Sequence, residues 1–397
     1  MAVKVTVAPD VYWVGAIDWN LRNFHGHTFS TKRGTTYNSY LIIDKKIALV
    51  DTVLGSFSGD LIKNIREIVD PAKIDYIVAN HVETDHSGAL PEVLKIAKNA
   101  QILCTQKCKE GLLRHYYGDW NFKTVKTGDS VSLGTKTLIF IEAPMIHWPD
   151  SMFTYLPEHK LLMPNDAFGQ HIATSKRFDD EVDKCALMDE AAKYYANILI
   201  PLNAVISKKL DEITKSGIAI ETIAPAHGII WRKRPADIIN AYAAWSKGLP
   251  LANGVLIVYE TMWKSTEKIA KEMARALANA GVRVAIHDIN SSDRTEIIKD
   301  LLDSNCLLVG SSTHDNNMLP GIAGFLDLIK GLKLKSRKGA AFGSYGWSGE
   351  AVKIIEKTLA ESGIEIIRPP MAVKYVPSET DLKDCFDYGE KIAEAVK

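Results

Sequence analysis

Four side chains that can bind a metal ion lie within six consecutive residues, in the segment His81-Val82-Glu83-Thr84-Asp85-His86. The mostly apolar run Ile74–Ala79 predicts a buried strand that ends just before them. A single histidine at such a place is more often structural or simply exposed. Four ionisable groups side by side are costly to bury unless they share a partner. The spacing therefore indicates a metal site.

Three later residues, His147, Asp166 and His227, are further candidate ligands, each in a loop after a predicted strand. The strands before His147 and His227 are expected at Thr137–Glu142 and Ile218–Ala224. Strand ends that deliver polar clusters are typical of two packed sheets flanked by helices. The other elements expected in this half are strands at Val11–Val14, Ser39–Ile43 and Ile47–Val50 and a helix at Leu61–Val69.

This ligand pattern resembles the metallo-β-lactamase superfamily over residues 1–250, which implies an αββα sandwich with a two-metal site. The zinc hydrolases of that superfamily usually carry histidine where this chain has Glu83. A carboxylate there makes the site richer in oxygen donors, which favours iron over zinc, and is typical of the flavodiiron subfamily. The resemblance implies a diiron site with one iron on His81, Glu83 and His147, the other on Asp85, His86 and His227, and Asp166 bridging them.

The pattern changes after Pro250–Gly254, which is expected to be a linker between domains at residues 1–250 and 251–397. Beyond it, apolar strands alternate with helices, and this rhythm predicts a doubly wound parallel sheet. Strands are predicted at Val255–Tyr259, Val284–His287, Cys306–Val309, Ala340–Gly343 and Glu365–Ile367, and helices at Thr266–Ala280, Arg294–Leu302, Ile322–Lys330, Glu350–Ser362 and Leu382–Val396.

Three polar loops follow the first, third and fourth of these strands, at the strand ends where a doubly wound sheet binds its ligands. Hydroxyls and amides at a helix N-terminus suit a phosphate. Together the loops resemble flavodoxin, which implies a flavodoxin-like domain with bound FMN. The chain has no Gly-x-Gly-x-x-Gly motif, which argues against direct oxidation of NADH. The residues implied to bind FMN are Thr261, Met262, Trp263, Lys264, Ser265, Thr266, Thr313, Asn316, Asn317, Ser344, Tyr345, Gly346, Trp347 and Gly349.

The two halves, in this order, resemble the flavodiiron proteins over the whole chain. That resemblance implies an oxidoreductase in which FMN passes electrons to the diiron site, where dioxygen is reduced to water or nitric oxide to nitrous oxide. An external donor, expected to be rubredoxin, supplies the electrons. The family's head-to-tail homodimer, or a dimer of such dimers, is expected, with Trp347 near the junction. In the family a His and a Tyr line the substrate pocket, and His25 and Tyr195 are the candidates here.

The composition limits the partners and the location. The 48 basic and 48 acidic residues cancel, which removes the electrostatic reason to expect nucleic acid or an anionic membrane. The five scattered cysteines form no Cys-x-x-Cys pair, so no rubredoxin or thiolate–zinc module is built in, and free thiols fit a reducing cytoplasm. A signal peptide and a membrane-length apolar run are both lacking, so a cytoplasmic protein is expected.

Two other functions stay open at this point. One is a dizinc hydrolase acting on a thioester or phosphodiester, with the flavodoxin half used for regulation or redox sensing. Glu83 and the three flavin loops argue against it. The other is an electron-transfer module whose metal site is vestigial, and the complete set of ligands argues against that.

Overall fold

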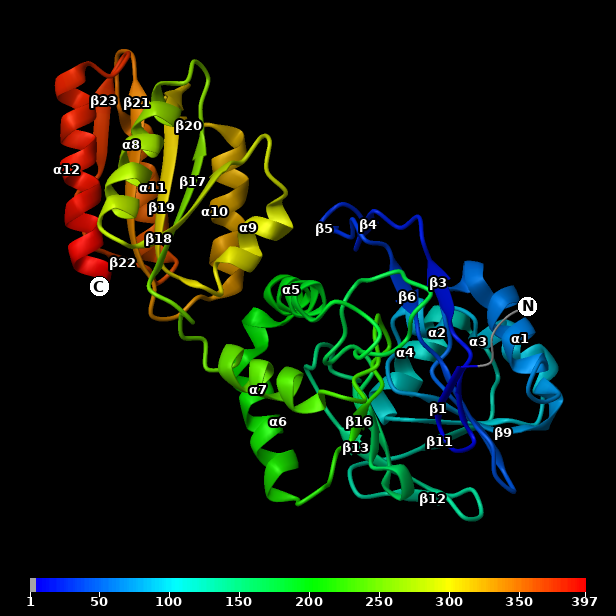
Figure 1. The fold of residues 1–397 in the computed structure, drawn as a ribbon. Helices are drawn as coiled ribbons and strands as arrows, with labels where there is room; N and C mark the ends of the chain where they lie inside the picture. Colours follow the sequence, from blue (N-terminus) through cyan, green and yellow to red (C-terminus); the bar gives the residue numbers. More distant parts are fainter. Residues whose placement is uncertain (1–4) are drawn as a thin grey trace. The chain divides into compact units, whose positions relative to one another are not determined.

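The computed structural model describes residues 5–397, which divide into two compact units (Figure 1). The first unit comprises Met1–Tyr194 and Ala204–Ala243, and the second comprises Tyr195–Asn203 and Ala244–Lys397. Among the helices of residues 5–397, none has both the length and the apolar character that a membrane crossing requires.

The first unit contains a seven-stranded mixed sheet in the order β1-β2-β7-β8-β9-β10-β11. The pairs from β1 to β8 are antiparallel and those from β8 to β11 are parallel. Parallel neighbours need crossover connections, and right-handed crossovers that advance in one direction place their helices on one face. The strands are β1 (Val5–Ala8), β2 (Val11–Trp13), β7 (Tyr40–Ile42), β8 (Ile47–Val50), β9 (Ile74–Ala79), β10 (Gln101–Cys104) and β11 (Phe122–Thr124).

A five-stranded sheet, in the order β12-β13-β14-β15-β16, packs against the first sheet. One buried cluster contains Ile42 and Val78 of the first sheet together with Phe140 and Leu161 of the second. The expected two-sheet sandwich is therefore confirmed. The strands are β12 (Ser130–Ser132), β13 (Thr137–Glu142), β14 (Met152–Leu156), β15 (Leu161–Met163) and β16 (Thr222–Ile223). Two further sheets have two strands each: β3 (Ala16–Asp18) pairs with β6 (Thr35–Tyr37), and β4 (Asn23–Phe24) pairs with β5 (Phe29–Ser30).

Helices of this half connect the strands, and several of them bury apolar side chains. For example, α1 buries Leu61 and Ile65, and the Thr105 hydroxyl caps α4 by accepting the backbone N–H of Cys108 at 3.1 Å. The helices are α1 (Ser58–Arg66), α2 (Thr84–Ser87), α3 (Leu90–Ile96), α4 (Gln106–Tyr116), α5 (Lys184–Tyr194), α6 (Asn203–Lys215) and α7 (Pro235–Trp245), and a π-helical segment, Tyr195–Leu199, follows α5.

The second unit is built on a parallel sheet in the order β18-β17-β19-β21-β22, so the predicted doubly wound sheet is confirmed. Every residue of β17 is buried, as expected for a central strand covered on both faces. The chain reverses direction across the sheet between β17 and β19, and such a switch point is where ligands bind. The strands are β17 (Gly254–Glu260), β18 (Arg283–Asp288), β19 (Ser304–His314), β20 (Asn317–Met318), β21 (Lys338–Tyr345), β22 (Glu365–Ile366) and β23 (Met371–Lys374).

Helices surround this sheet and complete its core. On α8, Ile269, Met273 and Leu277 recur every four residues and pack with Ile392 of α12 in one buried cluster. The helices are α8 (Ser265–Asn279), α9 (Arg294–Asp300), α10 (Pro320–Leu332), α11 (Glu350–Glu361) and α12 (Glu379–Val396).

Two predicted strands differ from the structure. The strand expected at Ile218–Ala224 is reduced to β16 (Thr222–Ile223), because residues 218–221 are used to lead the chain from α6 back to the sheet. The strand expected at Glu365–Ile367 is β22 (Glu365–Ile366), and a further strand that was not predicted, β23, also pairs with β21. Pro369 and Pro370 lie between them, and proline lacks the N–H that a sheet ladder requires.

Candidate functional site

The segment from His81 to His86 folds sharply after β9. The strand ends at Ala79, and the single-turn helix α2 begins directly after Glu83. The hydroxyl of Ser87 donates to the carbonyl of Val82 at 2.6 Å and fixes this turn. Side chains one to five residues apart are thereby directed to one place, which an extended strand could not achieve.

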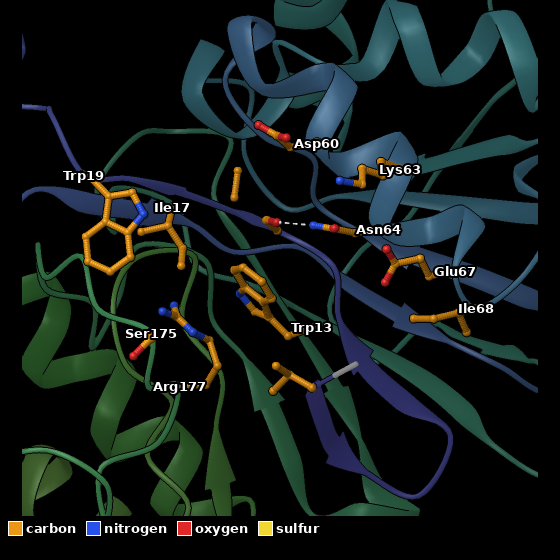
Figure 2. A pocket seen from close by; sticks show the side chains of 13 residues that line it. Trp13, Ile17, Trp19, Asp60, Lys63, Asn64, Glu67, Ile68, Ser175 and Arg177 are labelled. Atoms are coloured by element: carbon orange, nitrogen blue, oxygen red, sulfur yellow. Dashed lines mark hydrogen bonds between the residues drawn. The ribbon is translucent and has the colours of Figure 1, made fainter. Parts of the chain in front are cut away.

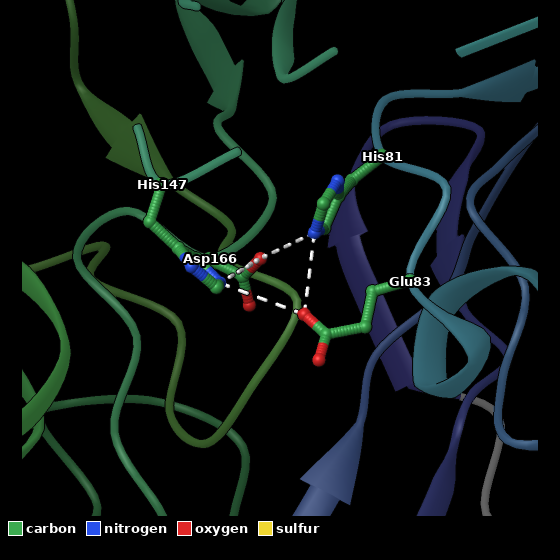
Figure 3. A group of neighbouring side chains, drawn as sticks. All are labelled: His81, Glu83, His147 and Asp166. Atoms are coloured by element: carbon green, nitrogen blue, oxygen red, sulfur yellow. Dashed lines mark hydrogen bonds and ion pairs between the residues drawn. The ribbon is translucent and has the colours of Figure 1, made fainter. Parts of the chain in front are cut away.

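The structure brings the seven predicted ligands together in two groups. In the first group, Nε2 of His81 and Nε2 of His147 lie 3.3 and 3.6 Å from Oε2 of Glu83 (Figure 3). In the second, Oδ2 of Asp85 lies 3.0 Å from Nε2 of His227 and 3.2 Å from Nε2 of His86. The ligand atoms of each group lie within 4.8 Å of one another, and the groups consist of His81, Glu83, His147 and Asp166, and of Asp85, His86 and His227.

Asp166 lies between the two groups and offers one oxygen to each. Its Oδ2 is 3.5 Å from Nε2 of His147, in the first group. Its Oδ1 is 3.1 Å from Nε2 of His86 and 3.5 Å from Nε2 of His227, in the second. A carboxylate placed in this way can bridge two metal ions.

Hydrogen bonds behind the histidines set which ring nitrogen faces the centre. Nδ1 of His227 lies 2.8 Å from the carbonyl oxygen of Thr36, which can only accept, so Nδ1 carries the proton. Nδ1 of His81 donates to the Asp150 carboxylate at 3.1 Å, and the same carboxylate accepts the backbone N–H of Val82 at 2.7 Å. Both Nε2 atoms therefore present a lone pair to the centre, as metal ligands must.

A buried carboxylate, Asp51, holds two of the ligand loops together. It accepts the backbone N–H of Asn80 at 2.8 Å and the side-chain amides of Asn80 and Asn165 at 3.0 and 3.2 Å. Asn80 and Asn165 directly precede His81 and Asp166 in the chain. Burial raises the pKa of Asp51 above its usual value. Asp51 therefore positions ligand-bearing loops from both sheets.

The electrostatics of the centre fit a bound cation. Both carboxylate oxygens of Asp85 and Oδ2 of Asp166 are buried without a hydrogen-bond partner. Burial alone would raise the pKa of Asp166, but His86 and His147 hold it well below its usual range, so this carboxylate is ionised. Buried anions without a partner are strongly destabilising. The mixture of imidazole nitrogen and carboxylate oxygen suits iron, and no cysteine contributes.

His25 lies beside this centre, next to Glu83. It occupies the turn between β4 and β5, and its Nε2 lies 3.0 Å from Oε1 of Glu83, the oxygen turned away from His81 and His147. Burial lowers the pKa of His25, but its hydrogen bond to Glu83 and the negative charges of Glu83, Asp85 and Asp166 together outweigh burial and leave the pKa raised. The ring is 35% exposed, so it joins Glu83 to solvent.

Tyr195 does not lie at the metal centre, so this prediction is wrong. Its neighbour Tyr194 lies there instead. The buried hydroxyl of Tyr194 donates to Oδ1 of Asp166 at 3.0 Å. The hydroxyl of Tyr195 donates instead to Asn203 at 2.6 Å, and its ring packs on Trp245. Consecutive helical residues point about 100° apart, and the chain passes from α5 into a π-helical segment at this step. Only one of the two tyrosines can face the centre.

Two residues that the sequence did not single out support this centre. Asp150, described above, lies in the loop that carries His147. An acidic residue three positions from a candidate ligand was the feature of the sequence that could have identified it. His171 is buried, and its ring centroid lies 5.0 Å from that of His227. Its Nδ1 lies 2.8 Å from the hydroxyl of Thr35. Burial and the neighbouring His227 hold the pKa of His171 well below its usual value, so it is neutral. An isolated histidine in a loop gives no such signal.

The second unit has a cavity of about 440 Å³ at the carboxyl ends of β17, β19 and β21. Beneath it, the hydroxyls of Thr266, Ser312 and Ser344 form a buried cluster with oxygen–oxygen distances of 2.9 to 3.3 Å. The lining residues that the sequence predicted are Met262, Trp263, Ser265, Thr313, Ser344, Tyr345, Gly346 and Trp347, and Ser312, His314, Tyr375 and Val376 also line it.

Several predicted flavin residues lie outside this lining for local reasons. Asn316 and Asn317 are exposed at the hairpin between β19 and β20, and Thr266 is buried below the cavity floor. Lys264 and Gly349 are the residues that precede α8 and α11. Thr261 is half-buried, and its hydroxyl has no hydrogen-bond partner.

Comparisons with known proteins agree with this architecture. The model of the ODP family of β-lactamases matches residues 35–228, and the flavodoxin model matches residues 257–389. The nitric oxide reductase of Moorella thermoacetica is 54% identical over 99% of both chains. The anaerobic nitric oxide reductase flavorubredoxin of Vibrio vulnificus is 41% identical over 98% of this chain and 80% of that protein.

Solved structures match over the same extent. The rubredoxin oxygen:oxidoreductase of Desulfovibrio gigas has a TM-score of 0.96 at 37% identity, covering 99% of this chain and 98% of that chain. The flavodiiron protein of Giardia intestinalis has a TM-score of 0.96 at 33% identity, over 100% and 97% of the two chains. The predicted fold, enzyme class and cofactor types are thereby confirmed. The chain belongs to the flavodiiron protein family of oxidoreductases.

Proposed function

We propose that this protein reduces nitric oxide to nitrous oxide and dioxygen to water, with electrons that enter through FMN. The observation that carries the proposal is the position of Asp166, whose two oxygens face two separate groups of ligand atoms. A dinuclear centre can hold two small molecules, or both atoms of one, at neighbouring metal positions. The nitric oxide reductase from Moorella and the oxygen oxidoreductase from Desulfovibrio support the two substrates.

The irons are assigned to the two ligand groups. One iron would be held by His81, Glu83 and His147, the other by Asp85, His86 and His227, and both would share Asp166. Both oxygens of Asp85 and Oδ2 of Asp166 are buried without a hydrogen-bond partner, and this supports the assignment, because a metal cation would balance their charge. Residues 1–250 are proposed as the diiron domain and residues 251–397 as the FMN domain.

FMN is assigned to the cavity of the second unit. Tyr345 and Trp347 would flank the flavin ring, and the phosphate would lie before the N-terminus of α8, close to the partnerless hydroxyl of Thr261. When bound, FMN supplies single electrons and the iron pair supplies a redox-active binding place for the substrate.

The protein's own groups manage protons and orientation around that place. His25 holds a proton at Nε2 toward Oε1 of Glu83, and its exposed edge can exchange that proton with solvent. The hydroxyl of Tyr194 fixes the orientation of Asp166 through Oδ1. His171, neutral and buried beside His227, keeps water away from that side of the centre.

Rubredoxin is proposed as the electron donor and a head-to-tail homodimer, or a pair of such dimers, as the assembly. Two of the matched proteins carry rubredoxin in their names, which supports the donor. Trp263 and Trp347 line the flavin cavity and are 89% and 81% exposed, which leaves large apolar side chains for a second chain to cover. The free cysteines support a reducing, cytoplasmic location.

One experiment separates this proposal from a dizinc hydrolase. The protein is produced with both iron and zinc available, and its metal and flavin contents are measured by elemental mass spectrometry and visible absorption. Anaerobic consumption of nitric oxide and aerobic consumption of dioxygen are then followed with reduced rubredoxin as donor. We expect iron in excess of zinc, bound FMN and turnover of at least one substrate. Zinc in place of iron, with no turnover of either gas, would contradict the proposal.

A further inference from the structure

A second cavity of the first unit, of about 450 Å³, shares no residue with the metal centre (Figure 2). Trp13, Ile17 and Trp19 form one side, and Lys63 of α1 and Glu67, the residue that follows α1, lie on the other. Trp19 is 52% exposed, which leaves part of its indole open for a ligand to cover. The volume is in the range of sites that hold small organic molecules.

The buried side chain of Arg177 lines one end of this cavity. Arg177 is only 3% exposed, and both its terminal nitrogens are buried without a hydrogen-bond partner. The guanidinium lies over the Trp13 ring at 4.8 Å from the ring centroid, and Figure 2 shows it beside Trp13 and facing the space below Ile17. Burial lowers its pKa to about 10, so the group is still a cation at neutral pH.

A buried guanidinium whose N–H groups have no hydrogen-bond partner favours the binding of an anion. Guanidinium and carboxylate form paired, parallel hydrogen bonds, which match the two free nitrogens of Arg177. The charges on α1 and just after it limit the kind of anion, because Asp60 and Glu67 line the cavity together with Lys63 and disfavour a multiply charged phosphate compound. The two indoles favour a flat apolar body.

We propose that this cavity binds a small organic monocarboxylate, with its carboxylate on Arg177 and its apolar body between Trp13 and Trp19. Binding at this site does not depend on the metal centre or on FMN, since no residue is shared. Failure of the proposed gas reduction would therefore leave this proposal standing, and the reverse also holds.

Titration calorimetry of the purified holoenzyme with benzoate, benzamide and acetate tests the proposal. Benzoate is expected to bind with a dissociation constant in the millimolar range or below. Benzamide lacks the charge and acetate lacks the apolar body, and each is expected to bind at least tenfold more weakly. No binding of benzoate, or equal affinity for all three compounds, would overturn the proposal.

Two variants locate the site. Arg177→Met is expected to weaken benzoate binding at least tenfold, whereas Arg66→Met, an exposed arginine on α1 outside the cavity, leaves it unchanged. Circular dichroism checks that each variant is folded. If Arg177→Met does not fold, Trp19→Ala serves instead, because the exposed indole contributes little to the core, and at least threefold weaker binding is expected. Unchanged benzoate affinity in a folded variant at either position would refute the assignment.

Discussion

The hydroxyl of Tyr194 lies 3.0 Å from Oδ1 of Asp166, the carboxylate oxygen that faces His86 and His227. The tyrosine is fully buried, and burial together with the nearby Asp166 raises its pKa well above the usual value. It therefore stays protonated and acts as a fixed hydrogen-bond donor to the shared carboxylate.

Replacing Tyr194 tests this role. Tyr194→Phe removes one donor without changing the shape of the core, so iron content is expected to stay the same. We expect kcat for nitric oxide or dioxygen to fall about tenfold or more, because the shared carboxylate loses its orientation. A change in the electron paramagnetic resonance signal of the mixed-valence iron pair should accompany the loss.

Tyr195→Phe is the matched control, since its hydroxyl donates to Asn203 and not to Asp166. Its turnover and iron signal are expected to equal those of the unmodified protein. Equal loss of turnover in both variants would exclude a specific role for Tyr194.

Removing the shared carboxylate should empty the metal centre. Asp166→Ala deletes the one ligand that contacts both groups, so iron per chain is expected to fall by about half or more. Elemental mass spectrometry measures the change. Asp180→Asn, at an exposed aspartate paired with Arg232, is the control and should keep its iron. Full iron content in Asp166→Ala would show that Asp166 is no ligand.

The hydrogen bond behind His81 should set iron affinity. Asp150→Ala leaves Nδ1 of His81 and the backbone N–H of Val82 without their acceptor. Loss of such a supporting carboxylate typically costs about 10- to 100-fold in metal affinity. Competition with a chelator measures the affinity. Asp150→Asn retains one acceptor oxygen, so its iron affinity is expected to lie between that of the unmodified protein and that of Asp150→Ala. Any other order of the three affinities would contradict this role of Asp150.

The aromatic rim of the second cavity should contribute to flavin binding. Trp347→Ala is expected to weaken FMN binding by about 1 kcal/mol, roughly fivefold in Kd, as for the loss of one aromatic contact. The thermal stability of the apoprotein should change little, because Trp347 is 81% exposed. Fluorescence quenching of added FMN measures the affinity. Tyr117→Ala, at an 87% exposed tyrosine of the first unit, is the control, and an equal effect at Tyr117 would argue against a specific contact.

Much of the metal centre follows from local sequence. The four candidates between His81 and His86 are joined by one strand end and one helical turn, so their convergence needs little from the rest of the chain. The alternation of strands and helices after residue 254 likewise determines the order of elements in the second unit. These features depend on side-chain periodicity, which is a local property.

Other features were decided only by the tertiary structure. Tyr194 and not Tyr195 faces the metal centre because of the rotation of the helix at the end of α5. A shift of one residue along the helix would exchange the two side chains. The pairing of Asp150 with His81 joins residues 69 positions apart. Such contacts are set by the packing of two sheets, which local periodicity does not encode.

The flavin cavity also combines features that follow from local sequence with features that depend on the tertiary structure. The loops after β17, β19 and β21 follow from the alternation of strands and helices, whereas Tyr375 reaches the cavity only because β23 pairs with β21. Asn316 and Asn317 lie in a predicted loop, but a hairpin turns them to solvent. The sequence by itself determined the fold class and the ligand types. Which side chains meet across strands, and the cavity beside Arg177, were decided by packing between distant segments, since burial and pairing there depend on the whole chain.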